Sequence, residues 1–114
     1  MINQFAVSVR KEGDYAVIYT DGYVNNLGGE KIAEVANELF NDGIKKLILN
    51  MEKSTVVNSI GISILIEIIE KLQEVGGKLV FCGLTKTIAK TFTIMGLTQF
   101  ATITETEESA VNSL

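Results

Sequence analysis

The chain has 114 residues, of which 46 % are hydrophobic and 21 % charged, and its formal net charge is −4. These values are typical of one globular domain that folds without disulfides or metals. The chain has no histidine and one cysteine, Cys82, which excludes Ser-His-Asp catalysis, phosphohistidine relays and the usual zinc ligand sets. The acidic balance, with no cluster of lysines or arginines, argues against nucleic acid as a partner.

Neither a secretory signal nor a membrane span is expected. No basic segment with a cleavage site opens the chain, and the longest apolar run, around residues 60–69, is interrupted by Ser63 and Glu67. We therefore expect a cytoplasmic protein with no direct membrane insertion. Cys82 lies in the apolar run 79–82, where a buried strand thiol is expected. No Asp/Glu cluster has the spacing of a magnesium site, so we expect no metal and no other cofactor.

The first third of the chain predicts a β-hairpin followed by a helix. Apolar and polar residues alternate over 5–10, a second strand is predicted over 15–20, and a tight turn at 12–14 joins these two strands. The helix that follows is predicted to have Asn26 as its N-cap and Gly43 just beyond its C-terminus.

The stretch from Ser54 to Gly77, which follows a strand at 46–51, has an ambiguous period. Isoleucines alternate at 60, 62, 64, 66 and 68, as they would in a strand. Polar side chains instead recur at spacings of three and four, which makes one stripe on a helix: Ser63, Glu67, Glu70, Lys71 and Glu74. The run is also long for a strand and ends in a glycine pair. We therefore predict a helix from Ser59 to about Val75.

The last third predicts two more strands and two more helices. A strand at 78–82 is followed by a helix that Gly83-Leu84-Thr85 opens and Gly96 ends, and then by a short strand at 102–103. Thr104-Glu105-Thr106-Glu107 is a capping-box pattern that starts a C-terminal helix.

The order of elements predicts a single α/β domain over residues 1–114. Its small mixed β-sheet has about five strands, and about four helices pack on it. In open α/β sheets, functional sites gather beyond the C-terminal ends of the strands. Here those positions are the loops at 22–27, 54–59 and 83–85.

The polar step Asn58-Ser59-Ile60-Gly61 opens the long helix. Asn and Ser are both good N-caps, so a serine here is most simply a cap. Gly61 is expected to leave the first turn uncovered, so that another molecule can approach its backbone.

In this order and spacing, these segments resemble the STAS domain, the fold of the bacterial anti-sigma factor antagonists, from residue 5 to residue 110. The resemblance is carried by the segments 47–51, 58–62, 76–81, 95–97 and 104–110. The family's site motif is Asp-Ser-Ser/Ala-Gly followed by an aliphatic residue, and a partner kinase phosphorylates its first serine. By position, Ser59 matches that phosphoacceptor, and Gly61 and Ile62 match the residues that follow. Asn58 stands in place of the Asp, and Ile60 in place of a small residue.

The resemblance implies a regulatory protein–protein interaction module that is not an enzyme. It would bind an anti-sigma factor/serine kinase, lose that partner when Ser59 is phosphorylated, and be reset by a phosphatase. A phosphate at a helix N-terminus is tolerated by the fold, whereas a docked partner would meet its new negative charge. The expected partner-binding residues are Asn25, Asn26, Asn58, Ser59, Ile60, Gly61, Ser63 and Thr85.

Two other functions stay open. The departures at Asn58 and Ile60 favour an unphosphorylated scaffold, or a soluble subunit of a signalling complex or of an ABC-type lipid transporter. Some STAS domains have been proposed to bind nucleotides, but the chain has neither a G-x-x-x-x-G-K-[ST] nor a G-x-G-x-x-G pattern. The sequence leaves open the identity of the partner and of any sigma factor, and whether the chain forms a weak homodimer.

Overall fold

The computed structural model describes residues 4–114, and residues 1–3 of the predicted domain lie outside the described residues. The strands are β1 (Ala6–Glu12), β2 (Tyr15–Asp21), β3 (Lys46–Lys53), β4 (Lys78–Cys82) and β5 (Thr102–Thr104). The helices are α1 (Asn26–Asn41), α2 (Ser59–Glu74), α3 (Lys86–Ile94), the short 3-10 helix η1 (Leu97–Gln99) and α4 (Glu107–Asn112). The predicted α/β fold, with a mixed five-stranded sheet and four α-helices, is confirmed.

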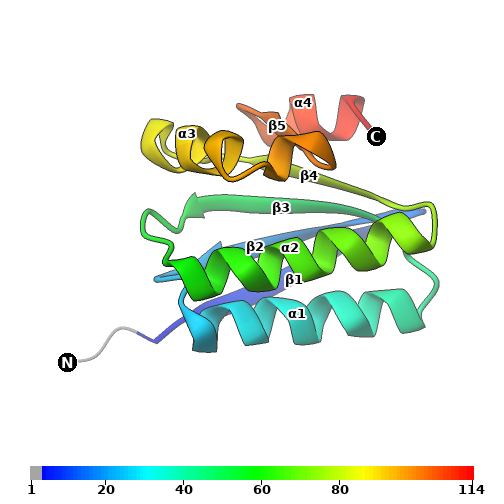
Figure 1. The fold of residues 1–114 in the computed structure, drawn as a ribbon. Coiled ribbons are helices and arrows are strands. Elements are labelled where there is room, and N and C mark those ends of the chain that lie inside the picture. Colours follow the sequence, from blue (N-terminus) through cyan, green and yellow to red (C-terminus); the bar gives the residue numbers. More distant parts are fainter. Residues whose placement is uncertain (1–3) are drawn as a thin grey trace.

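The strands form one sheet in the order β1-β2-β3-β4-β5 (Figure 1). β1 and β2 pair antiparallel as the predicted hairpin, with Ala6 opposite Asp21 and Glu12 opposite Tyr15. All other neighbouring strands pair in parallel. Because β2 to β5 point the same way, their C-terminal ends lie along one edge of the sheet.

Alternate residues of the strands enter two separate cores. Helices α1, α2 and α3 cover one face of the sheet, where Ile18, Leu49 and Phe81 are buried. Helix α4 covers part of the other face, where Ala110 packs in a smaller core that includes Cys82. The predicted buried strand thiol is therefore confirmed, and it lies beneath the shortest α-helix.

The segment with the ambiguous period is a helix, α2, as predicted. The five residues of the predicted polar stripe are all exposed, and the buried side is made by Gly61, Ile62, Leu65, Ile68, Ile69 and Leu72. The helix ends at Glu74, and Gly76 then adopts a positive φ of 72°, as expected of a helix stop. Neither α2 nor any other helix within residues 4–114 is long and apolar enough to cross a membrane.

Two predicted caps are wrong by one or two residues. Asn25, rather than Asn26, caps α1, and its Oδ1 accepts from the Gly28 N–H at 3.0 Å. Thr106, rather than Thr104, caps α4. Thr104 cannot be the cap because it pairs with Cys82 in the sheet.

Candidate functional site

The loops that follow β2, β3 and β4 lie at the sheet edge where the parallel strands end. The first two loops are joined by backbone hydrogen bonds. The Val24 N–H donates to the Val56 carbonyl at 3.0 Å, and the Asn58 N–H donates to the Val24 carbonyl at 3.1 Å. Val24 and Val57 also form an isolated parallel bridge. These bonds extend the sheet beyond β2 and β3 and hold the N-termini of α1 and α2 next to each other.

Three of the predicted partner-binding residues are helix caps at this edge. Asn25 caps α1, as described above. Asn58 caps α2, with its Oδ1 accepting from the Gly61 N–H at 2.8 Å. Thr85 caps α3, with its Oγ1 accepting from the Ile88 N–H at 3.1 Å. Asn26 is the exposed first residue of α1.

Ser59 is the first residue of α2, and its side chain is exposed. Its interpretation as a cap is wrong, because Asn58 takes that position. Within residues 4–114 the Ser59 hydroxyl makes no hydrogen bond, while the Ser63 hydroxyl donates to the Ser59 carbonyl at 3.0 Å. The hydroxyl therefore lies in solvent at the start of a helix, where backbone N–H groups and the helix dipole favour an anion.

Gly61 does not leave the first turn of α2 uncovered. It is buried, and a Cβ atom at this position would overlap the backbone carbonyl of Val24. The segment that approaches Gly61 is thus the loop between β2 and α1 of the same chain. A close approach at this glycine was correctly expected from the sequence, but the approaching segment belongs to the same chain and not to another molecule.

Four large apolar side chains are exposed on the two joined loops and the helix starts they lead to. The exposed fractions are 46 % for Tyr23, 57 % for Leu27, 53 % for Val56 and 54 % for Ile60. We refer to these four residues and Ser59 as the Ser59 surface. Only Ile60 and Ser59 were expected from the sequence. The sequence does carry a signal for Tyr23 and Val56, because each is a large apolar residue in a loop that also contains Asn, Gly or Thr.

A buried pair of hydroxyl groups lies at the start of the second of these loops. Thr20 is 3 % exposed and Ser54 is fully buried, and their Oγ atoms are 2.7 Å apart. Thr20 belongs to β2, and Ser54 follows the last residue of β3. Each hydroxyl satisfies the other in the core, so the loop that carries Ser59 leaves the sheet from a fixed point.

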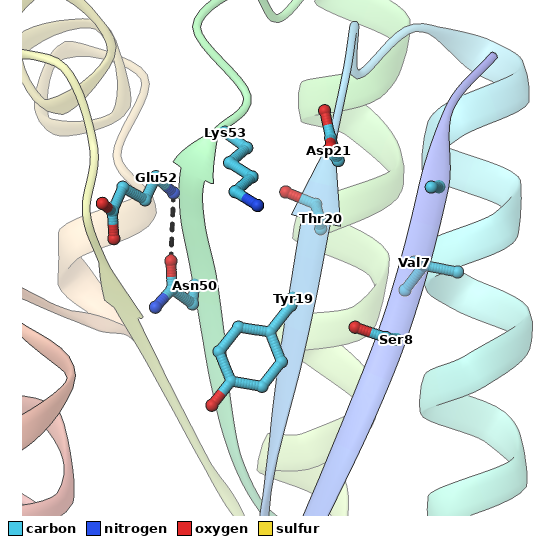
Figure 2. Close-up of a pocket in the computed structure, with 9 residues that line it drawn as sticks. Val7, Ser8, Tyr19, Thr20, Asp21, Asn50, Glu52 and Lys53 are labelled. Carbon is cyan, nitrogen blue, oxygen red and sulfur yellow. Dashed lines mark hydrogen bonds between the residues drawn. The ribbon is translucent and has the colours of Figure 1, made fainter.

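A separate cleft of about 430 Å3 is lined by residues of β1, β2 and β3 and includes side chains from the sheet face that α4 covers in part. Figure 2 shows Ser8, Tyr19 and Asn50 around it, with the Asn50 Oδ1 accepting from the Glu52 N–H at 3.0 Å. None of these cleft residues was expected from the sequence.

The polar groups next to this cleft hold α4 on the sheet. Arg10 donates to the Tyr19 hydroxyl at 3.2 Å and to the Glu107 carboxylate at 2.7 Å. Asn50 donates to the other oxygen of Glu107 at 3.2 Å. Burial alone would raise the pKa of Glu107, but hydrogen bonds with Tyr19, Asn50 and Arg10 outweigh it and lower that pKa. These groups are engaged in a structural network.

The thiol of Cys82 has low reactivity in this position. Burial, followed by the nearby charges of Glu107 and Glu52, raises the pKa of its thiol to about 11. The reactive thiolate is therefore scarce at neutral pH. Within residues 4–114, no three or more Asp, Glu, Cys or His side chains are grouped so that they could hold a metal ion.

Comparison with known proteins finds one family model that matches this chain and several solved structures that are similar to it. A family model described as the STAS domain matches residues 6–110. Similar solved structures include the Bacillus cell fate determinant SpoIIAA in its phosphorylated form, which is 22 % identical with a TM-score of 0.74, covering 95 % of this chain and 98 % of that one. An anti-sigma factor antagonist from Mycobacterium paratuberculosis is 15 % identical with a TM-score of 0.84, covering 96 % and 93 %. A variant of RsbS from Moorella thermoacetica is 21 % identical with a TM-score of 0.79, covering 94 % and 92 %. At these identities the structural likeness shows a shared fold.

Proposed function

The chain belongs to the STAS domain family, and on that basis we propose that it is a regulatory protein–protein interaction module, an anti-sigma factor antagonist. Unmodified, it binds an anti-sigma factor with serine kinase activity in the cytoplasm and thereby frees a sigma factor. Phosphorylation of Ser59 releases that partner, and a phosphatase restores the binding state. The observation that carries the proposal is the Ser59 hydroxyl, which is exposed and unbonded within the described residues, among four exposed apolar side chains.

The Ser59 surface suits reversible docking. Burying Tyr23, Leu27, Val56 and Ile60 against a partner removes apolar area from water, which favours the complex. A phosphate at Ser59 adds a charge of about −1.5 to −2 within this surface. Docking would then have to strip water from a dianion, and the complex would be lost unless the partner supplied compensating charge.

The fold itself is expected to tolerate the same phosphate. Asn58 already satisfies the Gly61 N–H, so the modified side chain displaces no cap. The remaining N–H groups of the first turn and the positive end of the helix dipole stabilise an anion at this position. Modification therefore changes binding and leaves the domain folded.

A binding role fits this surface better than catalysis. General acid–base chemistry needs titratable groups that converge on a substrate. The Ser59 surface and the three caps beside it offer hydroxyl, amide and apolar side chains, and the thiol of Cys82 is buried. We propose that the module acts through its partners and is not an enzyme.

Intact-mass measurement tests the phosphorylation directly. The protein is incubated with ATP and a candidate anti-sigma factor kinase from the same genome, and we expect the addition of one phosphate. Ser59→Ala should abolish it, whereas Ser63→Ala, one turn further along the same exposed side of α2, should retain it. A phosphate that persists in Ser59→Ala would reject Ser59 as the acceptor.

Ile60 supports a second candidate, a constitutive scaffold or a soluble subunit of a signalling or transport assembly. This side chain is 54 % exposed where the family motif has a small residue, so it adds a permanent apolar contact. Binding that survives Ser59→Asp but weakens in Ile60→Ala would favour the scaffold over the switch.

A further inference from the structure

Exposed carboxylates are concentrated on α1 and α2, whereas the charged side chains of α3 are all lysines. Exposed glutamates that form no ion pair within residues 4–114 occur at three positions on each of α1 and α2: Glu30, Glu34, Glu38, Glu67, Glu70 and Glu74. By contrast, residues 75–104 contain no Asp or Glu. Helix α3, within that segment, carries Lys86 and Lys90, which are exposed and likewise unpaired among the described residues.

The cationic side of α3 also carries an exposed apolar side chain. Ile94, one turn after Lys90, is 73 % exposed. Lys90 and Ile94 line an open groove of about 640 Å3 between α3 and the edge strand β5. We refer to Lys90 and Ile94 as the lysine face. In Figure 1, α3 lies at the β4–β5 side of the sheet, away from α1.

A groove of opposite charge lies between α1 and α2. It has a volume of about 290 Å3, and its glutamates are Glu67, Glu70 and Glu74. The apolar side chains that line it include Ala33 and Ile64. We refer to this feature as the glutamate groove. Lys71, its one lysine, donates to the neutral Asn37 amide oxygen at 2.8 Å and keeps its charge, and the three carboxylates leave the groove with a net negative charge.

We propose that the lysine face of one copy docks in the glutamate groove of a second copy. Contact between two lysine faces would bring Lys90 against Lys90, and contact between two glutamate grooves would bring carboxylates together, so both like-with-like arrangements are repulsive. The unlike pairing sets Lys90 against carboxylates and lets the apolar side chain of Ile94 enter a groove lined in part by Ala33 and Ile64. Charge complementarity within one sequence thus selects a head-to-tail contact.

A head-to-tail contact does not close on itself. Each bound copy still presents one free lysine face or one free glutamate groove, so short open chains form rather than a two-fold dimer. No residue of the Ser59 surface belongs to either contact region. This assembly therefore stands apart from the proposed phosphorylation switch and would leave Ser59 accessible in each copy.

Sedimentation velocity with two neutralised variants tests the proposal. The first, Lys90→Gln with Ile94→Ser, changes only the lysine face, and the second, Glu67→Gln with Glu70→Gln and Glu74→Gln, changes only the groove. At about 0.1 M salt, where the Debye length is about 10 Å, the wild-type protein should form species larger than a dimer as its concentration rises. Higher salt should weaken these species.

Mixing the variants gives the decisive result. Each variant alone should remain monomeric, because it lacks one half of the contact. An equimolar mixture should form a one-to-one dimer and nothing larger, since only one intact face and one intact groove are left to meet. A wild-type protein that remains monomeric throughout, or an association that either variant retains alone, would overturn the proposal. Circular dichroism of both variants establishes that they are folded.

Discussion

The carbonyl oxygen of Val24 occupies the space in which a side chain at Gly61 would begin. The same carbonyl accepts a hydrogen bond from the Asn58 N–H at 3.1 Å. These two contacts hold the backbone on both sides of Ser59, because Asn58 precedes Ser59 and Gly61 lies two residues after it. The position of the exposed hydroxyl is therefore set by the loop between β2 and α1.

Gly61→Ala should destabilise the domain. The added methyl group would push the loop carrying Val24 away from α2, and overpacking of this kind costs about 1–3 kcal/mol. Urea unfolding measures the change in the free energy of unfolding. Ser63→Ala, on the exposed side of the same helix, is the control and should change it by less than about 0.5 kcal/mol. Equal stabilities for the two variants would contradict the close packing at Gly61.

Substitutions at Asn58 separate capping from charge. Asn58→Ala removes the acceptor for the Gly61 N–H and should cost about 1 kcal/mol of stability. Asn58→Asp keeps an acceptor and adds a negative charge at a helix N-terminus, which should stabilise by about 0.3–1 kcal/mol. Thermal unfolding at neutral pH distinguishes the two. A loss of stability in Asn58→Asp equal to that in Asn58→Ala would show that the amide makes a contact other than the cap.

The buried hydroxyl pair predicts strong coupling between Thr20 and Ser54. Thr20→Val leaves the Ser54 hydroxyl buried without its partner and should cost about 1–3 kcal/mol. The double variant Thr20→Val with Ser54→Ala removes both polar groups, and part of that loss should be recovered. A double-mutant cycle in urea measures the coupling. Strict additivity of the two single effects would contradict a direct bond.

Glu107 should make stability depend on pH in the acid range. Because the folded state lowers its pKa, stabilisation is fully present above the pKa of the unfolded chain, about 4.3. It is lost as the pH falls through the lower, folded-state value. Glu107→Gln should cost about 1 kcal/mol at neutral pH, since the group is partly exposed and screened. It should also flatten the acid limb of the curve of stability against pH. An acid limb that is unchanged in Glu107→Gln would contradict this role.

Much of this fold was predictable because its local signals agree with its packing. In α2, alternating isoleucines competed with a polar stripe at helical spacing, and the stripe gave the correct helix because it required a single exposed side. The hairpin of β1 and β2 was marked by alternation in β1 and by a tight turn before a second, mostly apolar strand. Buried parallel strands were marked by short, nearly continuous apolar runs such as that of β4.

The site was less predictable, because its details depend on contacts between distant segments. The sequence does not distinguish Asn25 from Asn26 as the N-cap of α1. The hydrogen bonds that hold the loop at Val24 decide which of them takes that position. Gly61 reads as an open position until the β2–α1 loop is placed against it. Thr104 fits a capping box locally, but pairing with β4 takes it into the sheet. The apolar residues Tyr23 and Val56 become one surface only when their loops are joined.

The affinity of the protein for its cognate anti-sigma factor, measured by calorimetry on Ser59→Asp, tests the central claim most directly. Gln73→Glu, which adds a similar charge near the other end of α2, is the matched control. Ser59→Asp should bind about tenfold or more weakly, a loss of about 1.4 kcal/mol or more, with a Tm no lower than that of the wild-type protein, whereas Gln73→Glu should bind like the wild-type protein. Unchanged binding by Ser59→Asp, or equal weakening by both variants, would contradict the account.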